Sequence, residues 1–421
     1  MGHNKRLIEN IGSLTVLQGA NYILPLIILP YLVRVLGPER FGLVVFAQAF
    51  TQYFVILTDY GFNLSATRQI AIHRDDSDEV SKIFSSVMVM KFGLILLSFL
   101  LMSLTVRAIP RFHADRQLYF VCFLMVIGNA MFPTWLFQGM EKMRYITVLN
   151  IAAKLVGMAA IFLFVRKPSD YLVAAGVQSG GFVLAGLLAL ICLRSVVRVR
   201  YAFPSWSSVT MAATEGWHIF VSTAAISLYT NGNTFVLGLI AGNTAVGYFS
   251  AADKLVRAVQ GLLSPVSQAI YPHISSLAVR SREAAVEFVR KSLRWMGLFS
   301  FLMSILLLIL AEPLVRLFLG DGFGISVTVL RVMAFLPFIV ALSNVFGMQT
   351  MLPFGMKKLF SKIIVSAGLV SLLLIIPLSY MYGPGGAALA VLLTEILITL
   401  VMGITLQMKG FDLFCLRKQA A

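Results

Sequence analysis

The chain has 421 residues, of which 59% are hydrophobic and 12% are charged, and its mean hydropathy is +0.88. Apolar runs recur along the whole length, which excludes an ordinary soluble globular protein and predicts an all-α integral membrane protein. The formal net charge of +16 has to be interpreted from the positions of the basic residues, because membrane topology also uses Lys and Arg.

Apolar runs of about 20 residues, the length of a helix that crosses a bilayer, predict twelve transmembrane helices. The polar start MGHNKRLIEN leads into an apolar run without a small-residue cleavage site, so the first run is expected to be a span and not a signal peptide. The predicted spans are residues 11–33, 42–66, 83–106, 117–138, 145–165, 170–193, 216–240, 246–275, 295–318, 326–351, 359–382 and 385–408.

The basic residues favour one side of the predicted membrane. If the amino terminus is cytoplasmic, 21 Lys and Arg residues fall in cytoplasmic segments and 8 in the opposite loops. Because this bias sets the orientation of membrane proteins, both termini are predicted to be cytoplasmic. The basic charge is therefore mainly a topology signal, and the bilayer, not nucleic acid, is the predicted partner.

Two short matches suggest an internal repeat. FGLVVFAQAF at residues 41–50 aligns with VGYFSAADKL at 246–255, an offset of 205 residues, and GMEKM at 139–143 aligns with GMKKL at 355–359. Both matches pair a span with the sixth span after it, as a parallel repeat requires. We therefore expect two six-helix lobes around a central cavity, an amino-terminal lobe of residues 1–200 and a carboxy-terminal lobe of residues 201–421.

The eighth predicted span carries three charged residues, Asp253, Lys254 and Arg257. Each charge near the bilayer centre costs about 2.5–3.5 kcal/mol on translocon scales, so the group predicts a polar environment. Asp253 precedes Arg257 by four residues, which allows an ion pair within the helix. Arg257 and Lys254 are candidate ligands of an anionic head group, because guanidinium binds phosphate through two hydrogen bonds and ammonium adds a point charge. A structural ion pair between helices is the alternative.

Other spans also carry ionisable residues. Lys91 is expected to extend towards the membrane interface, whereas Lys154 lies deeper and is a candidate cation facing the cavity. Arg331, near the external end of its span, could contact a substrate late in transport. Glu395 could pair with a cation or exchange a proton, and the sequence does not separate these roles.

Polar residues line two further spans. The second span presents Gln48, Gln52, Asp59 and Asn63 at helical spacing. The seventh span contains Asn231 and Asn233, which suit either sugar hydroxyls or helix–helix hydrogen bonds.

The sequence predicts neither a catalytic residue nor a metal site. It lacks the phosphate-binding pattern GxxxxGK[ST], and Cys122, Cys192 and Cys415 have no metal-ligand spacing. The chain is therefore not expected to be an enzyme or to hold a cofactor, although a proton or sodium gradient could drive it through Asp59, Asp253 or Glu395.

Three strings carry a family resemblance. They are LGPERFGLVVFAQAFTQYFVILTDYGFNLSATRQIAIHRDD at residues 36–76, FQGMEKMRYITVLNIAAK at 137–154 and VGYFSAADKLVRAVQGLLSPVSQAIYPHIS at 246–275. The chain resembles the Wzx-type O-antigen and polysaccharide repeat-unit flippases, within the multidrug/oligosaccharidyl-lipid/polysaccharide superfamily.

This resemblance implies two six-helix lobes around a cavity, in a bacterial inner membrane. It implies that an undecaprenyl-pyrophosphate-linked oligosaccharide moves from the cytoplasmic to the periplasmic leaflet by alternating access, with a polysaccharide polymerase and a chain-length regulator as candidate partners. The chain has no arginine in its first span, unlike the peptidoglycan-lipid flippases that it distantly resembles, so their binding site does not transfer.

Two other functions remain open at this stage. A cation-coupled multidrug exporter would need acidic, aromatic-lined pockets, whereas the charged stripe of the eighth span is mainly basic. A membrane glycan polymerase or ligase would need a large external loop, but the longest predicted external loops have about ten residues.

Overall fold

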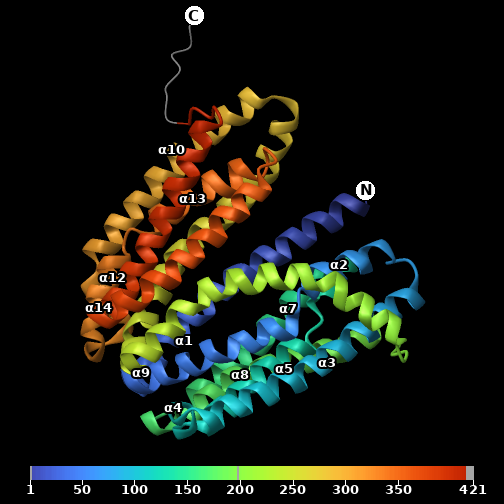
Figure 1. Cartoon of the computed structure of the whole chain (residues 1–421), viewed down its shortest axis with the longest axis horizontal. Coiled ribbons are helices and arrows are strands. Elements are labelled where there is room, and N and C mark those ends of the chain that lie inside the picture. Colours follow the sequence, from blue (N-terminus) through green and yellow to red (C-terminus); the bar gives the residue numbers. More distant parts are fainter. Residues whose placement is uncertain (1, 197–198, 414–421) are drawn as a thin grey trace, which may run out of the picture. The chain divides into compact units, whose positions relative to one another are not determined.

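The computed structural model describes residues 2–196 and 199–413 (Figure 1), and in that part of the chain every regular element is helical. Nine of its helical stretches are long and apolar enough to cross a membrane. Helices satisfy their own backbone hydrogen bonds, which is what the interior of a bilayer demands. The predicted all-α membrane fold is confirmed, and the count of twelve crossings stays a prediction.

The chain forms two compact units, Met1–Asn231 and Gly232–Ala421, called here the first and second units. The predicted lobe boundary at residues 200 and 201 marks the basic linker in the sequence and stays a prediction. The helix α9 (Trp206–Arg280) contributes to both units.

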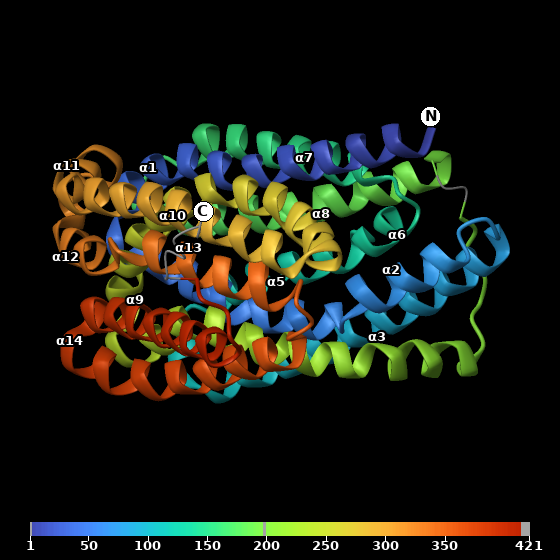
Figure 2. The ribbon, with the colours of Figure 1, turned by 90° about the horizontal axis from the view of Figure 1, so that it is seen from above.

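The first unit is a bundle in which α5 packs on α8, α7 packs on α8, and α1 packs on α5 and α7 (Figures 1 and 2). The closest approach is between α5 and α8, where a Cβ atom on Gly128 would lie 2.4 Å from the Val183 nitrogen. Small residues at such a contact let helix backbones approach within a membrane. Its helices are α1 (Gly2–Asp59), α2 (Phe62–Ile72), α3 (Ser77–Ala108), α4 (Pro110–Ala114), α5 (Arg116–Met131), α6 (Thr134–Gly139), α7 (Met143–Phe164) and α8 (Tyr171–Val196), with a 3₁₀ turn at Pro168–Asp170.

In the second unit α13 packs on α10 and α14, and α12 packs on α14. The predicted span 295–318 runs beyond the end of α10, because the chain turns there through α11 and a π-helical turn. The helices are α10 (Arg282–Ile309), α11 (Ala311–Leu314), α12 (Gly324–Met333), α13 (Leu336–Phe346) and α14 (Lys357–Met408), with π-helical turns at Val315–Leu319 and Gly347–Met351 and a 3₁₀ turn at Asp321–Phe323.

Single glycines interrupt the three longest helices. Gly37 in α1 has φ 70° and ψ 171°, Gly242 in α9 has φ 86° and ψ 176°, and Gly383 in α14 has φ 55° and ψ −129°. Pro38 and Pro384 follow two of them, at the first turn of the next helical segment, where proline is tolerated. Gly37 and Gly242 are 205 residues apart, the offset of the predicted repeat, so the two aligned segments follow equivalent breaks.

A second kind of break separates α1 from α2. Tyr60 (φ 47°) and Gly61 (φ 77°) are both left-handed, and the Tyr60 ring stacks on Phe220 of α9 with centroids 5.0 Å apart. A Cβ atom on Gly61 would lie 2.8 Å from Ile219 Cβ, and one on Gly216 would lie 2.7 Å from the Tyr60 carbonyl oxygen. Glycine on both sides therefore allows α9 to lie directly against the break.

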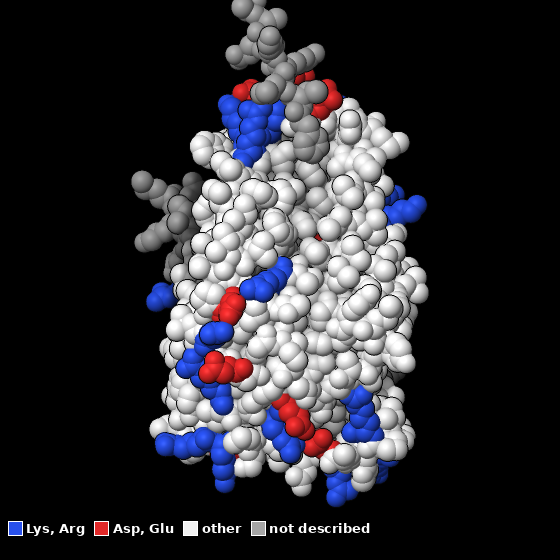
Figure 3. Space-filling view, turned by 90° about the vertical axis from the view of Figure 1, so that its left-hand side faces the viewer, with Lys and Arg blue, Asp and Glu red and all other residues white. Residues whose placement is uncertain are grey.

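The loop after α2 ends in a helix cap. The Asp76 carboxylate accepts hydrogen bonds from the backbone N–H groups of Glu79 and Asp78, each at 3.0 Å, and so begins α3. These donors hold the pKa of Asp76 below its ordinary value. Most of the face shown in Figure 3 is uncharged, and its charged side chains gather in separate groups.

Candidate functional site

Lys154 is a cation without a carboxylate partner in a membrane-spanning helix. It lies half-buried on α7, and its Nζ donates a hydrogen bond to Asn21 Oδ1 of α1. Among the described side chains no ion pair neutralises it. An amide oxygen can orient an ammonium group but does not offset its charge, so Lys154 is suited to contact an anionic ligand.

Lys91 is the opposite case. Its side chain is 2% exposed, and Nζ lies 3.4 Å from Asp59 Oδ1. Asn63 Nδ2 lies 2.9 Å from each oxygen of the same carboxylate. The expectation that Lys91 extends to the interface is wrong, because Lys91 is buried in the bundle beside the part-buried Asp59 carboxylate. Asp59, a candidate for ion coupling, is thus part of a part-buried ion pair at the break between α1 and α2.

The polar stripe of the second predicted span contacts α8. Gln48 Nε2 donates to Gln178 Oε1 at 3.2 Å, and both residues are partly buried. The first unit therefore joins α1 to α8 through neutral polar groups as well as through apolar packing.

In the second unit the predicted Asp253–Arg257 ion pair is present. Arg257 Nε lies 2.6 Å from Asp253 Oδ2; the Arg257 side chain is 58% exposed and that of Asp253 is 18% exposed. Lys254 is half-buried on the same turn of α9. The guanidinium is exposed, but the adjacent Asp253 carboxylate already offsets its charge.

The two candidate asparagines of the seventh predicted span have different environments. Asn233 is 7% exposed, and its Oδ1 accepts a hydrogen bond from Ser371 Oγ of α14 at 3.4 Å. Asn231 is half-buried, and its Nδ2 donates to the Ser227 carbonyl oxygen at 3.4 Å. Asn233 thus links two helices, the alternative that the sequence left open for this residue.

A cavity of about 490 Å³ in the second unit is lined by Arg331, Arg316 and Glu312. The Glu312 carboxylate forms ion pairs with both guanidinium groups. Arg316 Nη2 lies 2.7 Å from Glu312 Oε1, and Arg331 Nη2 lies 3.4 Å from Glu312 Oε2. The three side chains are 45% to 68% exposed, so solvent screens this cluster. Glu395 does not line this cavity and lies half-buried in the carboxy-terminal half of α14.

The candidate residues are therefore divided between the units. The first unit contains Lys154, Asp59 and Asn231. The second unit contains Lys254, Arg257, Asp253, Asn233, Arg331 and Glu395. Among the described residues no group of three metal-ligating side chains occurs, and Cys415 lies outside them.

Sequence reasoning missed several polar contacts. Lys91 and Asp59 are 32 residues apart and Gln48 and Gln178 are 130 apart, so local spacing gave no signal for either pair. Glu312 lies four residues before Arg316, and that helical spacing would have found their ion pair.

The comparisons with known proteins agree with this architecture. A family model described as polysaccharide biosynthesis protein matches residues 7–278. The chain belongs to this family. An Escherichia coli (strain K12) relative named "Putative O-antigen transporter" is 41% identical over 403 residues, 96% of this chain and 97% of that protein. A Shigella dysenteriae relative of the same name is 32% identical over 94% of this chain and 98% of that protein.

Two kinds of solved structure share the fold. An inward-facing multidrug resistance MATE family transporter of the MOP superfamily has a TM-score of 0.72 at 13% identity, over 97% of this chain and 100% of that one. The lipid II flippase MurJ in an inward closed conformation has a TM-score of 0.69 at 15% identity, over 96% and 89%. The predicted family and its all-α fold are confirmed, and the chain is a multi-pass membrane protein.

Proposed function

We propose that the chain is a flippase that moves an undecaprenyl-pyrophosphate-linked oligosaccharide from the cytoplasmic to the periplasmic leaflet of a bacterial inner membrane. The transporter names of its relatives and the flippase among its structural neighbours support this class. The observation that carries the assignment is Lys154, a half-buried cation in α7 whose polar contact is a neutral amide.

The chemistry of the substrate explains why such a cation is useful. A pyrophosphate carries at least two negative charges, and moving them through a low-dielectric region without compensation is strongly unfavourable. Lys154 in the first unit and Lys254 with Arg257 in the second would supply positive charge, with Arg331 as a contact late in transport. The polyprenyl chains stay in lipid, and no covalent bond is made or broken, so the chain is not an enzyme in this proposal.

The mechanism proposed is alternating access, in which the head group enters from one side and leaves on the other. Asp59, Asp253 and Glu395 are the candidates for coupling to a proton or sodium gradient. Both termini are placed in the cytoplasm, and a polymerase and a chain-length regulator are the proposed partners.

A leaflet-accessibility assay tests the function. Cells that lack the protein should accumulate the lipid-linked repeat unit on the cytoplasmic side, and wild-type protein should restore its exposure on the periplasmic side. Accumulation on the periplasmic side in the deletion strain would instead place the protein after flipping. Glycan chain length that changes in a reconstituted reaction would indicate a polymerase or ligase.

A cation-coupled multidrug exporter is the second candidate, since the MATE transporters share the fold. Export of cationic dyes from intact cells, together with normal exposure of the lipid-linked repeat unit in the deletion strain, would favour it over the flippase.

A further inference from the structure

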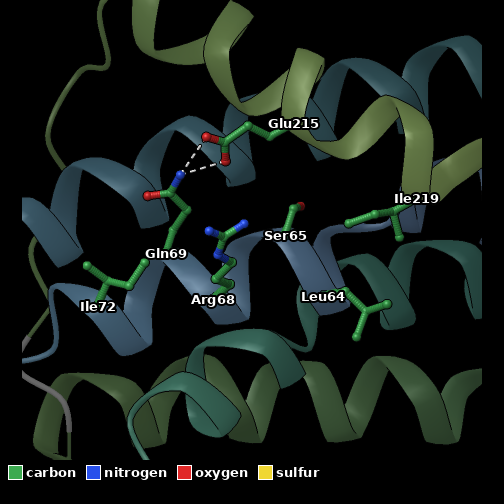
Figure 4. A pocket seen from close by; sticks show the side chains of 7 residues that line it. All are labelled: Leu64, Ser65, Arg68, Gln69, Ile72, Glu215 and Ile219. Carbon is green, nitrogen blue, oxygen red and sulfur yellow. Dashed lines mark hydrogen bonds between the residues drawn. The ribbon is translucent and has the colours of Figure 1, made fainter. Parts of the chain in front are cut away.

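A pocket of about 390 Å³ lies between α2 and the first part of α9, entirely within the first unit (Figure 4). Its walls carry charged groups of both signs, Arg68 on α2 and Glu215 on α9, next to exposed apolar side chains. None of these residues belongs to the proposed transport machinery, so the pocket is a separate site.

Arg68 supplies the positive group. Its guanidinium points into the pocket in Figure 4, and among the described residues it makes no hydrogen bond or ion pair. A guanidinium has five N–H donors in a planar arrangement that matches phosphate oxygens. Arg68 is therefore free to bind a phosphate group.

Glu215 supplies the negative group. Gln69 Nε2 donates to both of its carboxylate oxygens at 2.6 Å, which fixes the carboxylate on the pocket wall without cancelling its charge. Arg68 and Glu215 face the same space but do not form an ion pair. A simple anion near Arg68 would be repelled by Glu215, and a simple cation near Glu215 would be repelled by Arg68. The fitting ligand carries both charges.

The exposed apolar side chains that line the pocket indicate that the ligand is a lipid and not a soluble molecule. Leu64 and Ile72 of α2 are 66% and 64% exposed, and they belong to a helical stretch that is long and apolar enough to span the membrane. Large exposed apolar side chains in such a stretch are suited to contact acyl chains. We propose that the pocket binds a zwitterionic phosphoethanolamine lipid, with its phosphate on Arg68 and its ammonium group on Glu215.

The backbone around the pocket is held in place independently of any ligand. Gly61 and Gly216 bring α2 and α9 into direct contact, and Tyr60 stacks on Phe220. A second cavity of about 170 Å³ shares Gln69 and Glu215 with the first, so this hydrogen-bonded pair forms the wall between them. A lipid bound here would join α2 to α9 as a structural ligand, which is a role beyond the transport of substrate.

Lipid titration of the delipidated full-length chain tests the proposal. Phosphatidylethanolamine and phosphatidylglycerol with identical acyl chains share the phosphate, but only the first carries an ammonium group. Native mass spectrometry should show about tenfold tighter binding of phosphatidylethanolamine, the expected size of one charge-assisted contact. Equal binding of the two lipids would overturn the proposal.

Two variants separate the contacts. Arg68→Ala should weaken both lipids about tenfold, because both lose the phosphate contact. Glu215→Gln should weaken phosphatidylethanolamine alone, down to the level of phosphatidylglycerol. If Arg68 and Glu215 instead pair directly in the lipid-free protein, Glu215→Gln would release Arg68 and both lipids would bind more tightly, which would contradict the proposal.

Two controls complete the experiment. Arg74→Ala removes an exposed arginine of the same unit that already pairs with Glu141 at 3.0 Å and does not line the pocket, so it should change neither affinity. Soluble O-phosphoethanolamine lacks the acyl chains and should not displace the lipid at equal concentration. Displacement by it would show that the site recognises a free head group, and the lipid assignment would then be wrong.

Discussion

Two lysines within membrane-spanning helices of the first unit have opposite surroundings. Lys91 on α3 is 2% exposed and lies 3.4 Å from the Asp59 carboxylate, whereas Lys154 on α7 is half-buried and donates to the neutral Asn21. The partner decides what each cation can do. Removing the cation of a buried pair leaves its carboxylate uncompensated, whereas a lysine without a carboxylate partner remains available to an anionic ligand.

Arg257 in the second unit is intermediate between them. Its guanidinium pairs with Asp253 at 2.6 Å, and its side chain is 58% exposed. It can therefore contact a ligand, but Asp253 already offsets its positive charge. Lys154 is therefore the residue that we most strongly expect to contact the substrate. Four predictions test this comparison, from the largest expected effect to the smallest.

Lys91→Met should destabilise the protein by about 3–5 kcal/mol, because it leaves the Asp59 carboxylate without its cation inside the bundle. Thermal unfolding and the folded yield in detergent measure the loss. The double variant Lys91→Met/Asp59→Asn should recover most of it, since no uncompensated charge remains. A single variant as stable as wild type would show that the pair is not structural.

Lys154→Ala should lower the rate of flipping about tenfold to a hundredfold, the range for one lost charge-assisted contact of about 1.5–3 kcal/mol. Lys154→Arg should retain most of the activity, because it keeps the charge. Exposure of the lipid-linked repeat unit at equal protein level is the measurement. Full activity of Lys154→Ala would remove the main support for the proposed substrate contact.

Arg257→Gln should lower flipping by less than Lys154→Ala does, about threefold to tenfold, since Asp253 already offsets its charge. If Asp253 only offsets the charge of Arg257, Asp253→Asn should leave flipping unchanged or faster. The same assay decides between two roles for Asp253. A loss of flipping in Asp253→Asn would instead indicate that this carboxylate takes part in ion coupling.

Arg316→Gln should have the smallest effect, about 0.2–1 kcal/mol in stability, because its ion pair with Glu312 is exposed and screened. Thermal unfolding at low and high salt measures it, and the difference from wild type should shrink at high salt. An effect as large as that of Lys91→Met would contradict the distinction between buried and exposed pairs.

The sequence predicted the all-α membrane fold because the signal of a membrane-spanning helix is local. Long apolar runs need only the bilayer thickness and the rise of a helix, and the Asp253–Arg257 pair needs only a spacing of four residues. The partner of Lys91 depends instead on how α3 packs against the end of α1. A local sequence pattern does not show how two helices pack against each other. For the same reason Arg68 was counted only as a topology signal, because Glu215 lies 147 residues further along the chain.

The requirement for glycine at positions 37 and 242 comes from the backbone conformation and not from the space around the side chain. A Cβ atom at either position would meet no other atom within 4 Å, yet the positive φ with ψ near 180° belongs to a backbone region that L-residues avoid. The mirror image of this conformation is ordinary extended backbone. A D-alanine introduced by chemical synthesis at Gly37 should therefore preserve the turn that L-alanine would strain, and the same holds 205 residues later at Gly242.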